Sequence, residues 1–302
     1  MPELPDITVY VERIAVKAQG AVLRELKLHD AFVLRTAVPP VASLQGLRVV
    51  DVRRLGKRVV LGFANEGQAT PRLFLVIHLM TAGRLHWLPL AKAKGAKPLG
   101  HALATLKFDD GLLVLTEAGK RRRASLHVVD GEAGLAALDP GGIEPLACDL
   151  ASFTARLQSE NHTLKRALTS PRLISGIGNA YSDEILHRAR LSPLALTRAL
   201  DTDGWQRLYD ATRAVLVEWT ERLRAAAGDF PKDVTAFHPA MAVHGRYGQP
   251  CPVCGAPVQR IVHADNETNY CARCQTAGRV LADRALSRLL KDSWPRDIDE
   301  LL

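Results

Sequence analysis

The sequence predicts an α+β protein, with a β-sandwich in the first part of the chain and then helices with a small cysteine-rich hairpin. Short apolar runs with turn signals between them continue up to Thr116, helical spacing prevails beyond residue 149, and two Cys-x-x-Cys pairs lie near the end. Strand-rich and helix-rich segments that follow one another are typical of α+β proteins. A chain of 302 residues is long enough for about two domains, each with its own core.

The first expected element is a helix, because Ile7, Tyr10, Val11 and Ile14 recur at helical spacing. Apolar and β-branched runs after this helix indicate strands, and turn-forming residues separate them. The expected strands cover residues 49–52, 58–63, 73–78 and 112–116. Strands at this spacing predict a sandwich or a barrel.

Helical patterning follows a linker at 139–148, whose first half is rich in proline and glycine. A basic helix is expected over 160–168, and the turn Gly176-Ile177-Gly178-Asn179 is expected to open into another helix that Asn179 caps. A long helix is expected over about 203–226. The expected organisation is a sandwich domain at 1–138, the linker, a helical domain at 149–240, a cysteine hairpin at 241–276 and a helical tail at 277–302.

Four of the five cysteines form two Cys-x-x-Cys pairs, Cys251 with Cys254 and Cys271 with Cys274. Two such pairs can hold four thiolates in a tetrahedral array, which predicts one structural zinc ion per chain. Four protein ligands would leave no open position, so a catalytic metal is not expected. Cys148 stands alone and is expected to be an inert thiol.

The charge balance favours a polyanionic partner. The formal net charge is +8 and the sequence pI is about 9.4, which suits nucleic acid. No uncharged apolar run is long enough for a membrane span, and the N-terminus lacks the pattern of a signal peptide. We therefore expect a cytoplasmic protein that is associated with the nucleoid if the source is bacterial.

The start of the chain, Met1-Pro2-Glu3, carries a chemical signal. Removal of the initiator methionine would leave Pro2 with a free secondary amine, which titrates near neutrality and can attack an electrophilic carbon. Glu3 beside it could donate a proton. Such a start is common among ordinary proteins, and it gains meaning from the zinc hairpin near the other end.

Together these motifs resemble the formamidopyrimidine-DNA glycosylase and endonuclease VIII family over nearly the whole chain. The resemblance rests on Pro2–Pro5, Leu55–Arg58, His78-Leu79 with Gly83, Asp139-Pro140 with Gly142, Leu164-Lys165, Gly176–Glu184, Val243–Gly248 and the cysteine hairpin. It implies a β-sandwich domain and a helix–two-turn–helix domain with a zinc finger, which clamp DNA around a flipped base. It also implies a bifunctional DNA glycosylase and AP lyase that acts in base excision repair. The base it removes is expected to be damaged by oxidation.

The resemblance implies roles for individual residues. Pro2 would attack the sugar C1′ and form an iminium intermediate, Glu3 would protonate the sugar ring oxygen, and β- and δ-elimination would follow. Lys57 would hold a phosphate near the lesion, and Asp6 would be a supporting carboxylate where the family commonly has glutamate. The residues expected to contact DNA are Arg122, Lys165, Asn179, Tyr181, Arg246, Arg260 and Asn266. The expected partner is damaged duplex DNA, with single-stranded or bubble DNA left open, and a monomer is expected.

Besides Asp6, the chain departs from the family pattern in four places. Asn266 stands where an arginine is usual, and the position of the methionine that fills the hole left by the flipped base reads as Thr81. Met80 is expected on the opposite strand face. The tract 120–123 lacks an aromatic residue. Most of its four cations are expected to contact phosphates, and insertion of one arginine into the base stack stays open. Residues 228–235 form only a short lid, which leans towards the endonuclease VIII side.

Two alternatives stay open. One is an AP lyase with weak or unusual base specificity, and the other is a non-catalytic clamp that binds damaged DNA. The presence of Pro2, Glu3 and Lys57 disfavours the clamp, because binding alone does not need an N-terminal amine.

Overall fold

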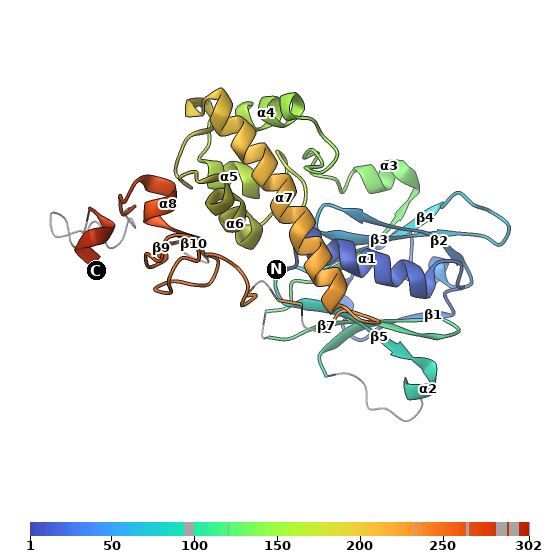
Figure 1. Cartoon of the computed structure of the whole chain (residues 1–302). Coiled ribbons are helices and arrows are strands. Elements are labelled where there is room, and N and C mark those ends of the chain that lie inside the picture. Colours follow the sequence, from blue (N-terminus) through green and yellow to red (C-terminus); the bar gives the residue numbers. More distant parts are fainter. Residues whose placement is uncertain are drawn as a thin grey trace. The chain divides into compact units, whose positions relative to one another are not determined.

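The computed structural model describes residues 1–93, 100–119, 121–232, 234–235, 237–263, 266–281, 289 and 296–301 (Figure 1). The chain divides into two compact units. Met1–Pro140 with Trp219–Thr235 form the first, which we call the sheet unit, and Gly141–Glu218 with Ala236–Leu302 form the second, the helical unit. No helix in the described part of the chain has both the length and the apolar character needed to cross a membrane.

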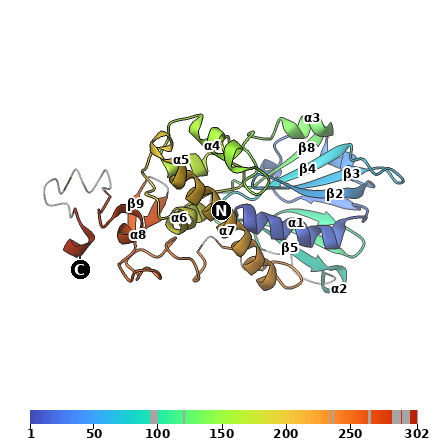
Figure 2. The same ribbon diagram turned by 45° about the horizontal axis from the view of Figure 1, so that its top comes forward.

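The sheet unit contains two four-stranded antiparallel sheets that enclose one hydrophobic core. One sheet has the order β1-β6-β7-β5 and the other the order β2-β3-β4-β8, which is visible in Figure 2. The strands are β1 (Glu25–Leu28), β2 (Arg48–Leu55), β3 (Arg58–Ala64), β4 (Leu73–His78), β5 (Gly83–Pro89), β6 (Ala102–Lys107), β7 (Gly111–Glu117) and β8 (Ser125–Asp130). The predicted sandwich is thus confirmed, and the four predicted strands correspond to β2, β3, β4 and β7.

Helix α1 (Leu4–Ala18) contributes Ile7, Tyr10 and Ile14 to this core, as their helical spacing predicts. Short helical segments complete the unit: α2 (Leu90–Ala93), α3 (Gly131–Ala136), η1 (Ala31–Val33) and η2 (Val41–Leu44). The guanidinium of Arg224, near the end of α7 (Thr202–Ala226), reaches both carboxylate oxygens of Glu12 on α1 at 2.6 and 2.8 Å. The last turns of α7 therefore belong to the sheet unit.

The segment after α7 also packs into the sheet unit. Phe230 is buried, and its ring centroid lies 5.8 Å from that of Tyr10 on α1. Lys17 forms an ion pair with Asp229 at 2.5 Å. This part of the segment that the sequence suggested as a short lid is therefore anchored in the core of the sheet unit.

The helical unit contains α4 (Leu150–Gln158), α5 (Leu164–Thr169), α6 (Asn179–Ala189), η3 (Thr197–Ala199) and most of α7. The expected start of the basic helix at residue 160 is wrong, because the Thr163 hydroxyl accepts a hydrogen bond from Arg166 N and caps α5 there. The expected cap of the next helix is also wrong. Gly178 occupies the N-cap position, and Asn179 is the first residue of α6.

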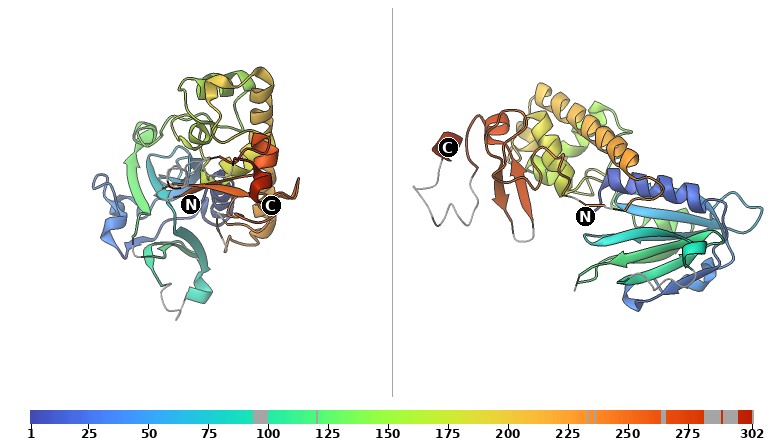
Figure 3. Two further views of the ribbon diagram at one scale, coloured as in Figure 1. Left: turned by 90° about the vertical axis from the view of Figure 1, so that its left-hand side faces the viewer. Right: turned by 60° about the horizontal axis from the view of Figure 1, so that its bottom comes forward.

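The cysteine hairpin of the helical unit consists of β9 (Gln259–Val262), β10 (Glu267–Tyr270) and α8 (Ala272–Thr276), drawn in orange to red in Figure 3. Its small core includes Tyr270, whose hydroxyl accepts a 2.7 Å hydrogen bond from Leu281 N. Leu281 is buried, as expected of the tail, and η5 (Ile298–Leu301) follows. Leu286 and Leu290, which were also expected to pack against the body, lie outside the described residues.

Candidate active site and nucleic-acid interface

The N-terminal amine lies among charged groups of the sheet unit. Pro2 is buried, and α1 begins two residues after it. In the unprocessed chain, the pKa of the Met1 amine is lowered from its ordinary value, mainly by burial and also by the charges of Arg84 and Lys57, while Glu3 opposes this shift. An amine at this end of α1 is therefore biased towards its neutral, nucleophilic form.

Two buried carboxylates stand beside this amine. Glu3 is 2% exposed and Asp6 is 5% exposed. Asp6 Oδ2 accepts a 2.9 Å hydrogen bond from Glu3 N, so the first turn of α1 fixes both residues. Burial raises the pKa of Asp6 to about 7, and the charge of Glu3 adds to the rise. The site thus holds one carboxyl group that is half protonated near neutral pH.

Lys57 lies in the tight turn between β2 and β3, where Gly56 adopts a positive φ of 59°. Its charge lowers the pKa of the Met1 amine and that of His78, at the end of β4. The pKa of His78 is about 4, chiefly because the ring is buried and secondly because Arg58 is near. The predicted lysine is therefore within electrostatic reach of the amine, and the neighbouring histidine is neutral at pH 7.

The start of β5 adds Arg84, which the sequence did not single out. Its guanidinium donates to the carbonyl oxygens of Gly83 at 2.7 Å and of Thr81 at 3.2 Å. Met80 adopts a positive φ of 52° in the turn between β4 and β5. The expectation of a strand at Met80 is therefore wrong. In the sequence, a lone arginine at the start of a strand looks like an ordinary solvated residue. Only the fold shows that Arg84 lies near the N-terminal amine.

Residues 121–123, which we call the arginine tract, are held in place by buried Glu117. Its carboxylate accepts hydrogen bonds from the backbone N–H groups of Arg123 and Ala124 at 2.8 and 2.9 Å. Arg122 donates to Asp30 at 2.7 Å, and Arg121, Arg122 and Arg123 are all exposed. Lys120 lies outside the described residues. The tract therefore presents three cations from a loop with a fixed backbone.

The four predicted zinc ligands come together in the helical unit. The sulfur atoms of Cys251, Cys254, Cys271 and Cys274 all lie within 4.8 Å of one another. Four thiolates at such separations fit a tetrahedral zinc ion with Zn–S bonds of about 2.3 Å. His187 Nε2 lies 3.3 Å from Cys251 Sγ and can support that ligand. The residues thus confirm a closed structural zinc site.

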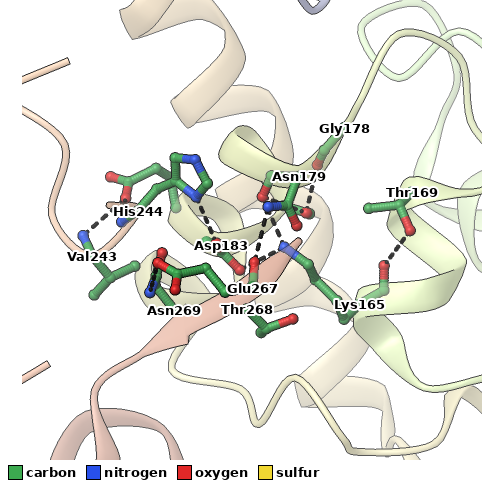
Figure 4. Close-up of polar contacts among 12 residues, drawn as sticks. Lys165, Thr169, Gly178, Asn179, Asp183, Val243, His244, Glu267, Thr268 and Asn269 are labelled. Carbon is green, nitrogen blue, oxygen red and sulfur yellow. Dashed lines mark hydrogen bonds and ion pairs between the residues drawn. The ribbon is translucent and has the colours of Figure 1, made fainter. Parts of the chain in front are cut away.

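A buried ionic network, shown in Figure 4, joins α5, α6 and the segment that precedes the hairpin. Asp183 receives Lys165 Nζ on one oxygen at 2.5 Å and His244 Nδ1 on the other at 2.8 Å. Lys165 Nζ also donates to Asn179 O at 2.7 Å. The ammonium of Lys165, which the sequence suggested for DNA, is thus directed into the helical unit.

Two further contacts tie this network to the hairpin. Asn179 Nδ2 donates to Glu267 O of β10 at 2.9 Å (Figure 4). Asn269 Oδ1 accepts from Gly245 N at 2.8 Å. Glu184 accepts from the backbone N–H groups of Ala242, Val243 and His244 at 2.7–2.9 Å. The hairpin therefore has a defined position on α6.

The remaining residues predicted to contact DNA differ in their contacts and in their exposure. Arg260 lies 4.2 Å from the ring centroid of Tyr247 and pairs with Glu267 at 3.3 Å. Arg246 donates to the carbonyl oxygens of Pro239 and Met241 at 2.9 and 3.3 Å. Asn266 is exposed in the hairpin turn, whereas Tyr181 is 3% exposed.

Sequence reasoning missed Asp183, Glu184 and His244 as organisers of this region. All three lie within motifs that carried the family resemblance, yet nothing in those motifs shows that their side chains meet. The sequence also did not single out Tyr247, which is 52% exposed and lies under the guanidinium of Arg260.

Comparison with known proteins agrees with both units. The formamidopyrimidine-DNA glycosylase N-terminal domain matches residues 1–126, the H2TH domain matches 142–226, and the zinc finger found in FPG and IleRS matches 248–277. Formamidopyrimidine-DNA glycosylase of Thermus thermophilus is 35% identical over 92% of this chain and 100% of its own length. That of Heliobacterium modesticaldum is 32% identical over 91% and 100%.

Solved structures show the same architecture. The crystal structure of MutM (Fpg) from Thermus thermophilus covers 91% of this chain and 98% of its own, with 32% identity and a TM-score of 0.75. Lactococcus lactis Fpg in complex with abasic-site DNA superposes with a TM-score of 0.78 at 23% identity, covering 91% of this chain and 99% of its own. The chain therefore belongs to the formamidopyrimidine-DNA glycosylase family, and it is a DNA-binding glycosylase with AP lyase activity that acts in base excision repair.

Proposed function

We propose that Pro2 is the nucleophile of this enzyme and that Glu3 is its proton donor. The observation that carries this assignment is the position of the N-terminal amine, whose pKa is lowered beside Lys57, Arg84 and the buried Glu3. Once Met1 is removed, the secondary amine of Pro2 takes this place. A neutral amine at pH 7 to 8 can attack without prior loss of a proton.

The chemistry follows in balanced steps. The Pro2 nitrogen bonds to C1′ as the bond from C1′ to the base breaks, and the base leaves with its bonding pair. The C1′–O4′ bond then breaks, O4′ takes a proton from Glu3, and the nitrogen loses its own proton to leave a cationic iminium. Loss of a C2′ proton expels the 3′-phosphate in β-elimination, and a second elimination removes the 5′-phosphate. Asp6 shares the first turn of α1 with Glu3 and would receive or return protons between steps.

Lys57 and the cations of the described loops would hold the DNA backbone. Lys57 would bind a phosphate beside the lesion. Arg122, Arg246 and Arg260 would bind more distant phosphates, and Asn266 would contact DNA from the hairpin turn. We propose that Lys165, Asn179 and Tyr181 act mainly by holding the helices and the hairpin in place. Lys165 and Tyr181 are buried, and Asn179 bonds to the hairpin.

The substrate is proposed to be an oxidised base in duplex DNA, bound by a monomer at the nucleoid. The relatives named above are called formamidopyrimidine-DNA glycosylases, which favours an oxidised purine over the endonuclease VIII side suggested by the short lid. Single-stranded and bubble DNA are secondary candidates.

The test is single-turnover cleavage of labelled duplexes that carry an oxidised purine, an oxidised pyrimidine or a preformed abasic site. We expect excision of an oxidised base, and Glu3→Gln should slow excision at least a hundredfold while DNA affinity changes little. Lys57→Met should weaken both steps, whereas Lys107→Met, in the exposed end of β6, provides a matched control. Unchanged excision by Glu3→Gln would exclude its role as the acid.

One observation supports a second candidate, an AP lyase with weak base specificity. Among the described residues of the hairpin turn, Asn266 is exposed and uncharged, and nearby Arg260 pairs with Glu267. Weak binding of the strand that carries the lesion would reduce the excision of a base more than the cleavage of a preformed abasic site. Cleavage of the abasic duplex alone, in the panel above, would favour this candidate.

A further inference from the structure

Residues 278–302 follow the segment that matches the zinc finger, which ends at residue 277. Three described residues of this tail belong to the core of the cysteine hairpin. Ile298 is 1% exposed, Leu281 is 3% exposed and Val280 is 8% exposed. Among the described residues, the branched aliphatic side chains of this core are Val243, Val258, Ile261, Val280, Leu281 and Ile298. The tail thus supplies half of them.

Main-chain hydrogen bonds join the tail to the helix that carries one of the zinc ligands. The segments 278–280 and 296–298 pair through an antiparallel bridge. Ile298 N donates to Gly278 O at 2.9 Å, and Gly278 N donates to Ala272 O of α8 at 3.0 Å. The last described residues therefore pack directly against the end of α8.

Gly278 allows this close approach. Its φ is +91°, a conformation that favours glycine, and a Cβ atom at this position would lie 3.0 Å from Asp297 Oδ2. Ala277 before it has a φ of 51° and ends α8. The chain thus turns back at the end of α8, and the small residue at the turn leaves room for the C-terminal segment.

An ion pair joins the same two segments. Arg273, which lies between the ligands Cys271 and Cys274, donates to Asp299 at 2.6 Å. Their side chains are 42% and 70% exposed, and pairs between solvated groups contribute little to stability. Ile298, in contrast, is removed from water almost completely, and burial of apolar surface stabilises the folded state. The contact that holds the C-terminal segment is therefore the buried isoleucine.

Zinc binding and folding of a small hairpin are linked. Four thiolates are rarely preformed in an unfolded chain, so the free energy of zinc binding is also free energy of folding. A group that stabilises only the folded hairpin therefore raises its affinity for zinc. Core residues from the tail have this effect although they provide no ligand.

We propose that residues 296–301 close the core of the zinc hairpin through Ile298, so that retention of zinc, and with it DNA binding by the hairpin, depends on the C-terminal end of the chain. Ile298 is a positioning residue, since it acts through α8 and the cysteine ligands. The proposal does not rest on the assignment of Pro2, because zinc release is measured in the absence of DNA.

The test follows the transfer of zinc from the full-length protein to pyridylazoresorcinol by absorbance. It compares wild type with Ile298→Ala, Ile298→Val and a chain that ends at Arg296. Asp299→Asn tests the ion pair separately. Leu106→Ala, a core position with 0% exposure in β6 of the sheet unit, is the control for a general loss of stability. DNA affinity is measured on a duplex with an uncleavable abasic-site analogue, with and without added zinc.

We expect Ile298→Ala and the shortened chain to release zinc faster, on the order of a hundredfold, because a large buried side chain is lost. Ile298→Val should accelerate release by less than about tenfold, and Asp299→Asn by less than about fivefold. Leu106→Ala should release zinc at the wild-type rate. At limiting zinc, Ile298→Ala should bind DNA weakly, and excess zinc should restore its affinity.

Zinc release at the wild-type rate in Ile298→Ala and in the shortened chain would overturn the proposal. An equal acceleration in Leu106→Ala would do the same, because it would show a general effect on stability. DNA affinity that stays low in excess zinc would also contradict a role through the metal site. If Ile298→Ala did not fold, Ile298→Val would decide, with faster release in support and the wild-type rate against.

Discussion

The ammonium of Lys165 lies 2.5 Å from the carboxylate of Asp183, and their side chains are only 11% and 0% exposed. The other oxygen of Asp183 receives His244, and Lys165 also donates to Asn179 O. Asn179 in turn bonds to the backbone of β10. One buried carboxylate therefore organises the contact between α5, α6 and the zinc hairpin, and with it the position of the hairpin residues that we propose to contact DNA.

Replacement of Lys165 by methionine should leave Asp183 buried with only its histidine partner. Removal of one member of a buried ion pair costs about 3–5 kcal/mol, because the remaining charge is desolvated. We expect Lys165→Met to lower the unfolding midpoint of the helical unit in urea and to weaken DNA binding. Arg166→Met, at the adjacent exposed position, is the matched control.

The double variant Lys165→Met/Asp183→Leu separates charge from packing. It removes both members of the pair, so it should recover part of the stability lost in Lys165→Met. A double variant as unstable as the sum of the single ones would show that the pair is not coupled.

Gly83 should resist substitution even by alanine. A Cβ atom at this position would lie 2.2 Å from Leu79 O, and the backbone there also forms the Gly83 N to Leu79 O hydrogen bond. Relief of such a clash typically costs 1–3 kcal/mol, and here it would shift the turn that positions Arg84. We expect Gly83→Ala to lower the melting temperature and the excision rate. Gly100→Ala, where a Cβ meets nothing within 4 Å, should change neither.

The raised pKa of Asp6 predicts a specific dependence of folding stability on pH. Its pKa is about 7 in the folded protein because of burial, against an ordinary value of 3.8. Between these values the folded state keeps a proton that the unfolded chain has lost, so stability falls as pH rises from about 4 to 7 and then levels off. Asp6→Asn should remove this part of the dependence. Melting temperatures at pH 5 and pH 8 provide the measurement, with exposed Asp110→Asn as control, and an unchanged pH profile in Asp6→Asn would contradict the assignment.

Zinc should be needed for DNA binding more than for the reactivity of the amine. The hairpin has a small core of its own. Within it, Gln275 Oε1 accepts a hydrogen bond from Cys271 N at 2.8 Å, and Gln275 Nε2 donates to Leu191 O, which follows α6, at 2.9 Å. We expect one zinc per chain by elemental analysis, and we expect Cys254→Ser to lose zinc together with most of its DNA affinity. Full binding by zinc-free protein would contradict a structural role.

The sequence was sufficient for the fold class, the zinc ligands and the strands with continuous apolar runs. β4 is buried on both faces, so its composition alone marks it as a strand. β5 and β8 were missed because Arg84, His86 and Pro89 interrupt the one, and Ser125, His127 and Asp130 interrupt the other. Their strand conformation depends on pairing with β7 and β4.

The sequence named the chemical groups of the candidate site, but it did not show which of them are buried. Lys165 and Asn179 were expected to contact DNA because they match family positions that do so, and because the glycine turn before Asn179 is a natural phosphate seat. Their engagement with Asp183 and Glu267 depends on residues 18 and 88 positions away, which no local pattern reveals. The same holds for Arg122, whose partner Asp30 is 92 residues away in sequence.

The most direct test of the central claim is borohydride trapping with a duplex that carries an oxidised base, followed by peptide mapping of the adduct. We predict one covalent adduct per chain, on the nitrogen of Pro2, in protein that has lost Met1. The adduct should disappear when an extra residue precedes Pro2, while DNA binding persists. An adduct on an internal lysine such as Lys57, or efficient excision of the base by the N-terminally extended chain, would contradict this account.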